Sequence, residues 1–170
     1  GSHTTVVCLR TIEPALITLA KSHDFQLKVI GDARYALPGV DVSSQAWIAA
    51  SEVSDLETID IGIMPLPDDA WTRGKCGLKA LQYMALGIPT IASPVGVNAG
   101  IIQDGENGFL ASTSQEWVEK LTLLVKDAAL RERLGKAGRR TVEERFSGKR
   151  QAERLLDVFR QTAPAMKQKE

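Results

Sequence analysis

Residues 73–87 hold the side chains whose types and spacing are best suited to chemistry. Lys75, Lys79 and Gln82 recur at i, i+4 and i+7, so a helix over about 75–86 would place them on one face. This polar stripe begins at the helix N-terminus, where free N–H groups and the helix dipole favour an anion. Two lysines there could neutralise a diphosphate, and the glutamine amide could bond the hydroxyls of a ribose.

Four small or apolar residues complete this candidate site: Gly74, Cys76, Gly77 and Leu78. The two glycines would let a ligand approach the backbone closely. A competing interpretation makes the polar stripe nothing more than the solvated face of an amphipathic helix. A loop rich in proline and aspartate precedes the helix and itself follows a buried strand. This context favours the interpretation of the polar stripe as a binding site over its interpretation as a solvated helix face.

A second loop, residues 93–100, follows the next expected strand and adds Gly96, Val97 and Asn98 to the candidate site. The glycine would again suit close contact between the backbone and a ligand. Asn98 could meet the ligand or cap the following turn, and capping is the favoured role. Residues 104–108 are expected to form only a turn.

Strands and helices are expected to alternate along the chain. Short apolar runs predict strands at 25–30, 59–64, 90–93 and 109–111, with a minor strand near 40–42. Helical spacing predicts helices at 9–20, 51–58 and 75–86, and a C-terminal helical part, 114–163, with helices at 117–126, 128–146 and 149–161. The alternation predicts an α/β fold with a Rossmann-like parallel sheet and helices on both faces. Ligands of such sheets bind at the carboxyl ends of the strands, where both candidate loops begin.

Length and composition predict one domain over residues 1–170, with a frayed tail at 164–170. The 21 basic and 21 acidic side chains balance, which excludes the basic surface that nucleic acid or an anionic membrane requires. No apolar run is long enough to cross a bilayer. Cys8 and Cys76 are far apart and have no histidine partner, so we expect a reduced compartment and no metal site.

Six segments, in this order along the chain, together resemble the group 1 glycosyltransferases. They are Asp60–Leu66, Gly74–Lys79, Gln82–Pro89, Ala92–Asn98, Asn107–Ala111 and Leu134–Arg140. The resemblance covers about residues 9–147. It is specific because all the segments occur together, and no single segment would suffice. It implies a retaining, metal-independent enzyme of the two-Rossmann GT-B fold, of which this chain would be the C-terminal half.

The resemblance also implies that this domain holds a nucleotide diphosphate sugar as donor, without a cofactor or metal. Many members carry two glutamates eight positions apart, where this chain has Gly74 and Gln82. A subset carries lysines at this junction, and this chain looks like that subset. Members begin the domain with a strand and a glycine-containing loop that touches the diphosphate. Ser2 and His3 resemble that loop, although Gly1-Ser2-His3 is equally explained as the remnant of a tag.

In the family, the acceptor pocket lies on an N-terminal domain of the same protein. The catalytic residues on the acceptor side are therefore expected outside this chain, and the fragment alone is expected to be inactive. Helix 149–161 would cross back onto that domain, so its apolar stripe is expected to be exposed here or buried by self-association. The implied setting is bacterial polysaccharide biosynthesis in the cytoplasm, or at the inner face of the membrane for the full-length protein.

Two other functions remain open at this point. A non-catalytic α/β module could bind a nucleotide or phosphate for regulation or scaffolding, and Gln82 in place of a glutamate is compatible with that role. An epimerase or phosphorylase of the same fold is a further alternative, for which His3 and His23 look unsuited. No GxGxxG follows a strand, which argues against a dinucleotide dehydrogenase.

Overall fold

A computed structural model describes the backbone of residues 3–162 and the side chains of residues 6–162. Its strands are β1 (Gln26–Ile30), β2 (Asp41–Gln45), β3 (Gly62–Met64), β4 (Thr90–Ala92) and β5 (Phe109–Leu110). Its helices are α1 (His3–Arg10), α2 (Glu13–Ala20), the 3-10 turn η1 (Ala49–Ser51), α3 (Glu52–Glu57), α4 (Ala70–Arg73), α5 (Leu78–Ala85), α6 (Asn98–Ile101), α7 (Ser114–Lys126), α8 (Ala128–Arg145) and α9 (Gly148–Thr162). The expected tail, 164–170, lies outside the described residues.

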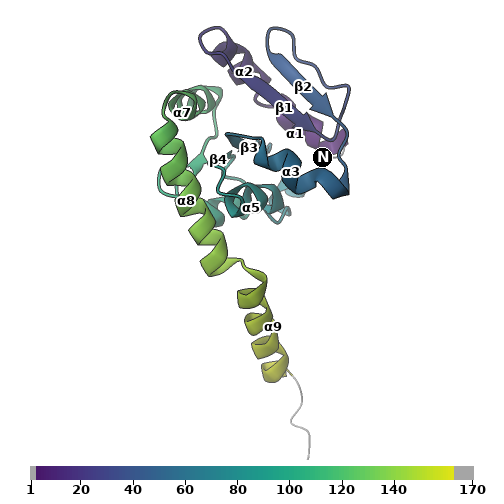
Figure 1. The fold of residues 1–170 in the computed structure, drawn as a ribbon. Coiled ribbons are helices and arrows are strands. Elements are labelled where there is room, and N and C mark those ends of the chain that lie inside the picture. Colours follow the sequence, from purple (N-terminus) through teal and green to yellow (C-terminus); the bar gives the residue numbers. More distant parts are fainter. Residues whose placement is uncertain (1–2, 163–170) are drawn as a thin grey trace, which may run out of the picture.

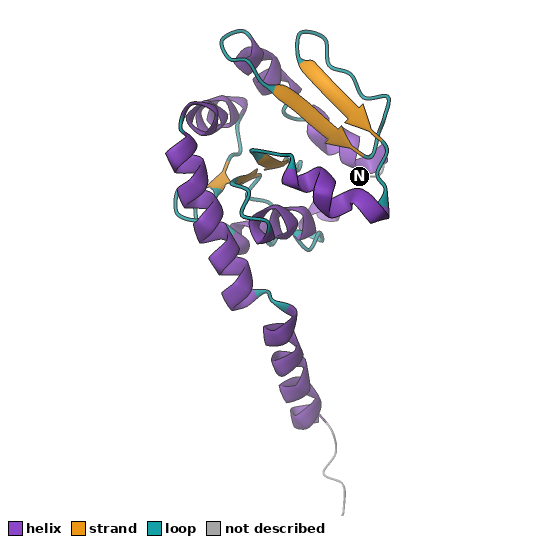
Figure 2. Cartoon of the chain, viewed as in Figure 1, coloured by secondary structure: helices purple, strands orange, loops and turns teal. Residues whose placement is uncertain are grey.

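The described strands form parallel sheets, as expected, but they form two sheets rather than one (Figure 2). β1 pairs with β2, and β3, β4 and β5 form the second sheet in that order. Helices pack on both sides of the second sheet, which confirms the predicted α/β architecture (Figure 1). Cavities lined by residues of both β1 and β3 lie between the two sheets.

Alternating side chains of β4 join two different cores. Ile91 is fully buried in a core that includes Leu19 of α2 and Trp117 of α7. Ala92, on the opposite face, is fully buried in a core that includes Met84 of α5. Successive side chains of a strand point to opposite faces, so these two residues place α2 and α7 on one side of the sheet and α5 on the other. A strand covered on both faces usually has consecutive apolar side chains, as β4 has at Ile91 and Ala92.

Three local predictions need correction. The helix expected over 9–20 is two helices, because Pro14 cannot continue a helix that would run through Arg10. The loop expected after β3 contains a short helix, α4. The helix expected to begin near Lys75 begins at Leu78, because Gly77 has a φ of 70° and a residue in that conformation cannot extend a right-handed helix.

α8 lies so close to the loop after α5 that only a glycine fits at the contact. A Cβ atom added to Gly135 would lie 2.0 Å from the carbonyl oxygen of Gly87, which is a backbone atom. One turn further on, a Cβ on Gly138 would lie 3.1 Å from the carbonyl oxygen of Asn107. These two glycines therefore bring α8 against the loops at the ends of the sheet.

We expect Gly135→Ala to lower the free energy of unfolding by roughly 1–3 kcal/mol, because the helix must move to admit the methyl group. This loss should outweigh the gain of about 1 kcal/mol that alanine offers in a helix. Urea unfolding of the variant measures the effect. Gly148→Ala is the matched control, because an added Cβ there meets nothing within 4 Å. Equal stability of the two variants would contradict the close contact.

α9 extends away from the rest of the molecule (Figure 1). All its described side chains are exposed, and they include the large apolar residues Leu155, Leu156, Val158 and Phe159. The predicted exposure of this stripe is confirmed, and self-association through it stays a prediction. Within the described residues, no helix has the length and apolar content that crossing a membrane would require.

We expect the chain to associate with rising concentration, because the apolar stripe of α9 gains by leaving water. Phe159→Ser should shift this association to higher concentration in sedimentation experiments. Arg154→Ser, on the same helix but outside the stripe, is the control and should have a smaller effect. A chain that stays monomeric at every concentration would contradict the prediction.

Candidate functional site

A cavity of about 480 Å³ opens at the carboxyl ends of β1 and β3, where a parallel α/β sheet usually binds its ligand. Six of the seven main candidate residues line it: Gly74, Lys75, Cys76, Gly77, Leu78 and Lys79. Gln82 does not line this cavity. Its remaining wall comes from α1, from β1 and the following Asp32, from residues 63–66 and from Tyr83. The segment between β3 and α5 therefore forms one side of the hollow.

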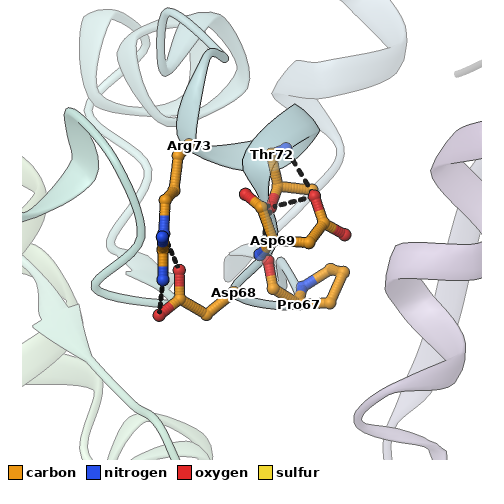
Figure 3. A network of polar contacts seen from close by, with 5 residues as sticks. All are labelled: Pro67, Asp68, Asp69, Thr72 and Arg73. Atoms are coloured by element: carbon orange, nitrogen blue, oxygen red, sulfur yellow. Dashed lines mark hydrogen bonds and ion pairs between the residues drawn. The ribbon is translucent and has the colours of Figure 1, made fainter.

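Short-range hydrogen bonds shape the first half of that segment (Figure 3). The Asp69 carboxylate accepts a hydrogen bond from Thr72 N at 2.8 Å, and Asp69 N donates to Thr72 Oγ1 at 3.2 Å. The Thr72 hydroxyl, which is fully buried, also donates to the Pro67 carbonyl. This reciprocal capping starts α4 and turns the chain sharply after β3. The spacing of Asp69 and Thr72 was the sequence signal that would have predicted α4.

Arg73 and Asp68 form an exposed ion pair with two parallel hydrogen bonds across the same turn (Figure 3). Arg73 Nε lies 2.6 Å from Asp68 Oδ1, and Nη2 lies 3.1 Å from Oδ2. The guanidinium holds the pKa of the Asp68 carboxyl below its usual range. Neither residue of this pair lines the cavity.

Gly77 and Gly96 allow the two candidate loops to pack on each other. A Cβ on Gly77, which has a φ of 70°, would lie 2.6 Å from Ile101 Cδ1. A Cβ on Gly96, which has a φ of 57°, would lie 2.6 Å from the carbonyl oxygen of Arg73. The loops are tied further by the hydrogen bond of 3.0 Å from Leu66 N to Ser93 Oγ. The glycines thus hold the loops together, in addition to any contact with a ligand.

The three residues of the second loop lie outside the cavity lining. Asn98 is only 1% exposed and donates from Nδ2 to the Ser93 carbonyl at 3.1 Å. It begins α6 but does not cap it, because the N-cap is Val97 and the helix has no side-chain cap, so the expected capping role is wrong. Val97 is exposed. Ser2 lies outside the described residues, and His3 begins α1 with its side chain outside them.

Lys75 does not share a helical face with Lys79 and Gln82, contrary to the prediction from spacing. It precedes α5, and its Nζ lies 4.0 Å from the centroid of the Trp71 ring. That distance is typical of a cation–π contact. Lys75 still lines the cavity, on the loop at the N-terminal end of α5.

Lys79 and Gln82 do share a face of α5, and both contact Glu52 of α3. Glu52 Oε1 lies 3.0 Å from Lys79 Nζ and 3.3 Å from Gln82 Nε2. The hydrogen bond from Lys79, with a second from Trp47, holds the pKa of the Glu52 carboxyl below its usual value. The buried Oε1 of Gln82 has no hydrogen-bond partner among the described residues. The sequence analysis did not identify Glu52. Lys79 and Gln82 lie 27 and 30 positions further along the chain, and local sequence patterns do not indicate contacts at such separations.

No group of three or more His, Cys, Asp or Glu residues within the described part of the chain could hold a metal ion. Four charged side chains line the cavity: Lys28 of β1, Asp32 after β1, Lys75 of the loop and Lys79 in the first turn of α5. Such an arrangement can bind an anion through ammonium groups and backbone N–H groups together.

Comparison with known proteins identifies a family for the central part of the chain. Residues 59–141 match the family of group 1 glycosyl transferases. Spore coat protein SA of Bacillus subtilis is 37% identical over 81 residues, 46% of this chain and 22% of that protein. A D-inositol 3-phosphate glycosyltransferase of Paenarthrobacter aurescens is 28% identical over 152 residues, 88% of this chain and 35% of that protein. The chain thus spans far less than two thirds of these relatives.

Solved structures agree with this assignment. The C-terminal domain of a glycosyl transferase group 1 family protein from Francisella tularensis has a TM-score of 0.68 at 26% identity, over 86% of this chain and 84% of that one. Sucrose-phosphate synthase from Thermosynechococcus elongatus shares the fold, with a TM-score of 0.73 at 21% identity over 90% of this chain and 42% of that one. Residues 59–141 therefore match the group 1 glycosyl transferases, and the described fold is that of a C-terminal domain from a protein of this family.

Proposed function

We propose that this chain is the donor-binding domain of a retaining, metal-independent glycosyltransferase. The full protein would move a sugar from a nucleotide diphosphate sugar to an acceptor. The observation that supports this most is the cavity at the carboxyl ends of β1 and β3, with Lys75, Lys79 and the start of α5 on its wall. Two relatives named D-inositol 3-phosphate glycosyltransferase match this chain at 35% and 28% identity.

The cavity has the groups that a leaving diphosphate needs. Negative charge builds on the diphosphate as its bond to the anomeric carbon breaks, so cations and oriented dipoles lower the barrier. Lys75 and Lys79 would supply the cations. Gly77, the N-cap of α5, has no side chain to bond the first amides of the helix, which leaves them to an anion. No metal is required in this arrangement, because the two ammonium groups take its place.

Donor binding would require an exchange of partners at Lys79. Its ammonium group is held by Glu52 at 3.0 Å, and the pair is partly exposed. An arriving diphosphate carries more charge than one carboxylate and would compete for the same ammonium group. The Gln82 amide, which also contacts Glu52, lies one turn further along α5 and outside the cavity lining, and it would bond a neutral hydroxyl of a ribose that extends toward α3.

The acceptor would be bound by an N-terminal domain of the same protein. Transfer requires the acceptor oxygen to be held against the anomeric carbon, and a donor domain alone cannot hold it. We therefore expect the present chain to bind nucleotide without transferring sugar to any acceptor.

Calorimetric titration with UDP, GDP and ADP tests the donor site. One of the three should bind, with unchanged affinity in a chelator, and Lys79→Ala should weaken binding by about tenfold or more, the loss expected for one charged hydrogen bond. Lys136→Ala is the matched control, because this lysine lies on α8 and pairs only with Glu132 there. Equal losses for the two variants, or no binding of any nucleotide, would contradict the proposal.

The ion pair between Glu52 and Lys79 should make stability depend on pH. Lys79 holds the pKa of Glu52 below its ordinary value of 4.5, so the ionised carboxylate stabilises the folded state above that value. This contribution is lost as the pH falls through the lowered pKa. Glu52→Gln should therefore lower the urea midpoint at neutral pH, and the two proteins should converge as the pH falls below 4.5. A difference between the two proteins that stays constant with pH would contradict the pairing.

A further inference from the structure

Glu52, the first residue of α3, gathers hydrogen-bond donors from two other parts of the chain. Its Oε1 lies 3.0 Å from Nζ of Lys79 and 3.3 Å from Nε2 of Gln82, so α3 lies beside α5 (Figure 1). Trp47, in the loop between β2 and η1, donates a further hydrogen bond to the Glu52 side chain. Of these residues, Lys79 lines the cavity of about 480 Å³. The carboxylate is therefore one side chain away from the place of the proposed diphosphate.

The ion pair of Glu52 with Lys79 is open to exchange with a ligand. The Glu52 side chain is 26% exposed and that of Lys79 is 37% exposed. A partly exposed ion pair contributes little net stability, since solvent screens it. A diphosphate in the cavity would draw the Lys79 ammonium group away, because it carries more charge than one carboxylate. The Glu52 carboxylate would then keep only the neutral donors of Trp47 and Gln82.

A carboxylate in that position selects for hydroxyl groups. The ordinary pKa of a glutamate, 4.5, lies well below neutral pH, so Glu52 stays ionised after Lys79 has turned away. An ionised carboxylate has acceptor oxygens only, so it repels phosphate and bonds O–H and N–H groups. The group next to the phosphates of a nucleoside diphosphate is the ribose, which carries a 2′- and a 3′-hydroxyl. In doubly wound sheets that bind dinucleotides, an Asp or Glu accepts a hydrogen bond from such a hydroxyl.

The contacts of α5 provide places for two hydroxyls. Lys79 and Gln82 bond the same oxygen of Glu52, so the ammonium group lies beside the amide. A hydroxyl that takes the place of Lys79 Nζ would find Glu52 Oε1 at 3.0 Å, which is a hydrogen-bond distance. Oε1 of Gln82 is buried and has no hydrogen-bond partner among the described residues. An unpaired buried acceptor is costly, so a second hydroxyl that reaches it would be bound firmly.

We propose that Glu52 binds the ribose of the nucleotide, its carboxylate accepting a hydrogen bond from one hydroxyl of the 2′,3′-diol while the Gln82 amide bonds the other. Trp47 is a positioning residue, because its N–H group holds the carboxylate in place when Lys79 turns to the diphosphate. The domain thereby selects ribonucleotides over their deoxy forms. This inference rests on the proposed donor site, and it adds a residue of α3 and a specificity to that site.

A competing interpretation is that Glu52 only competes with the ligand for Lys79. Replacement of Glu52 by glutamine distinguishes the two. Loss of a competitor would free Lys79 and tighten the binding of every phosphate ligand, whereas loss of a ribose contact weakens only ligands that carry the hydroxyls. The ratio of the affinities for a nucleotide and for its 2′,3′-dideoxy form isolates the ribose contact, because competition for Lys79 affects both ligands equally.

Calorimetric titration of UDP, GDP and ADP, each beside its 2′,3′-dideoxy form, measures this ratio. For the nucleotide that binds, the unmodified chain should prefer the ribose form by about tenfold or more, as expected for a hydrogen bond to a charged group. Glu52→Gln should reduce this preference by about fivefold or more, because an amide bonds a hydroxyl more weakly than a carboxylate does. Trp47→Phe, which lacks the N–H group, should reduce it less. The matched control Glu57→Gln, exposed at the other end of α3, should keep the full preference.

Inorganic pyrophosphate, which lacks the ribose, checks that the cavity survives the substitution. Its affinity should be unchanged or higher in Glu52→Gln. Equal losses for pyrophosphate and for the nucleotide would show that Glu52 only maintains the fold of the site, and would overturn the proposal. An equal gain for the ribose and dideoxy forms would show that Glu52 only competes for Lys79.

The same titrations separate this inference from the proposed function. Binding of a nucleotide without preference for its ribose form would overturn the inference alone and leave the donor site standing. Absence of binding by all three nucleotides would overturn the donor site, and the inference with it.

Discussion

The packing of α5 against the β3–β4–β5 sheet is the constraint on which the site depends. Ala80 and Met84 are fully buried beneath the sheet, which fixes the rotation of the helix about its axis. Tyr83 lies so close to Gly62 of β3 that a Cβ there would meet its ring at 2.4 Å. With that face buried, Lys79 and Gln82 must point to the side of α3, and the N-terminus of the helix must face the cavity.

The charge available to a ligand at this site comes from a few nearby groups, because the protein as a whole has no net charge. The chain has equal numbers of acidic and basic side chains, so a negatively charged ligand gains nothing from the molecule as a whole. The cavity instead offers the N-terminus of α5 and three lysines, Lys28, Lys75 and Lys79, against one carboxylate, Asp32. One of these lysines is already paired with Glu52, so the pair competes with a ligand and keeps the ammonium group ordered before binding.

Close backbone contacts connect the site to the rest of the fold. Gly77 and Gly96 bring the loops after β3 and β4 together, and Gly135 brings α8 to the loop that ends α5. Two cavities lined by both β1 and β3 lie between the sheets, and one of them is the site.

Much of this arrangement could be predicted from the sequence. Apolar runs bounded by glycine and proline predicted the strands, and helical spacing predicted the C-terminal helices, because both patterns are local. The loop before α5 was found from its glycines and lysines, and most of those residues do line the cavity. The resemblance to group 1 glycosyltransferases rested on the same local segments, and the comparisons confirm it.

The amino-acid sequence by itself thus determined the class of fold, the family and the segment that carries the candidate site. Only the tertiary structure decided that Lys75 lies outside α5, that Glu52 meets Lys79, and that the strands form two sheets with cavities between them. Local propensity depends on neighbours a few residues apart. These three features depend on the left-handed backbone of Gly77 in its packed loop and on contacts between elements far apart in the chain, which form only when the elements pack.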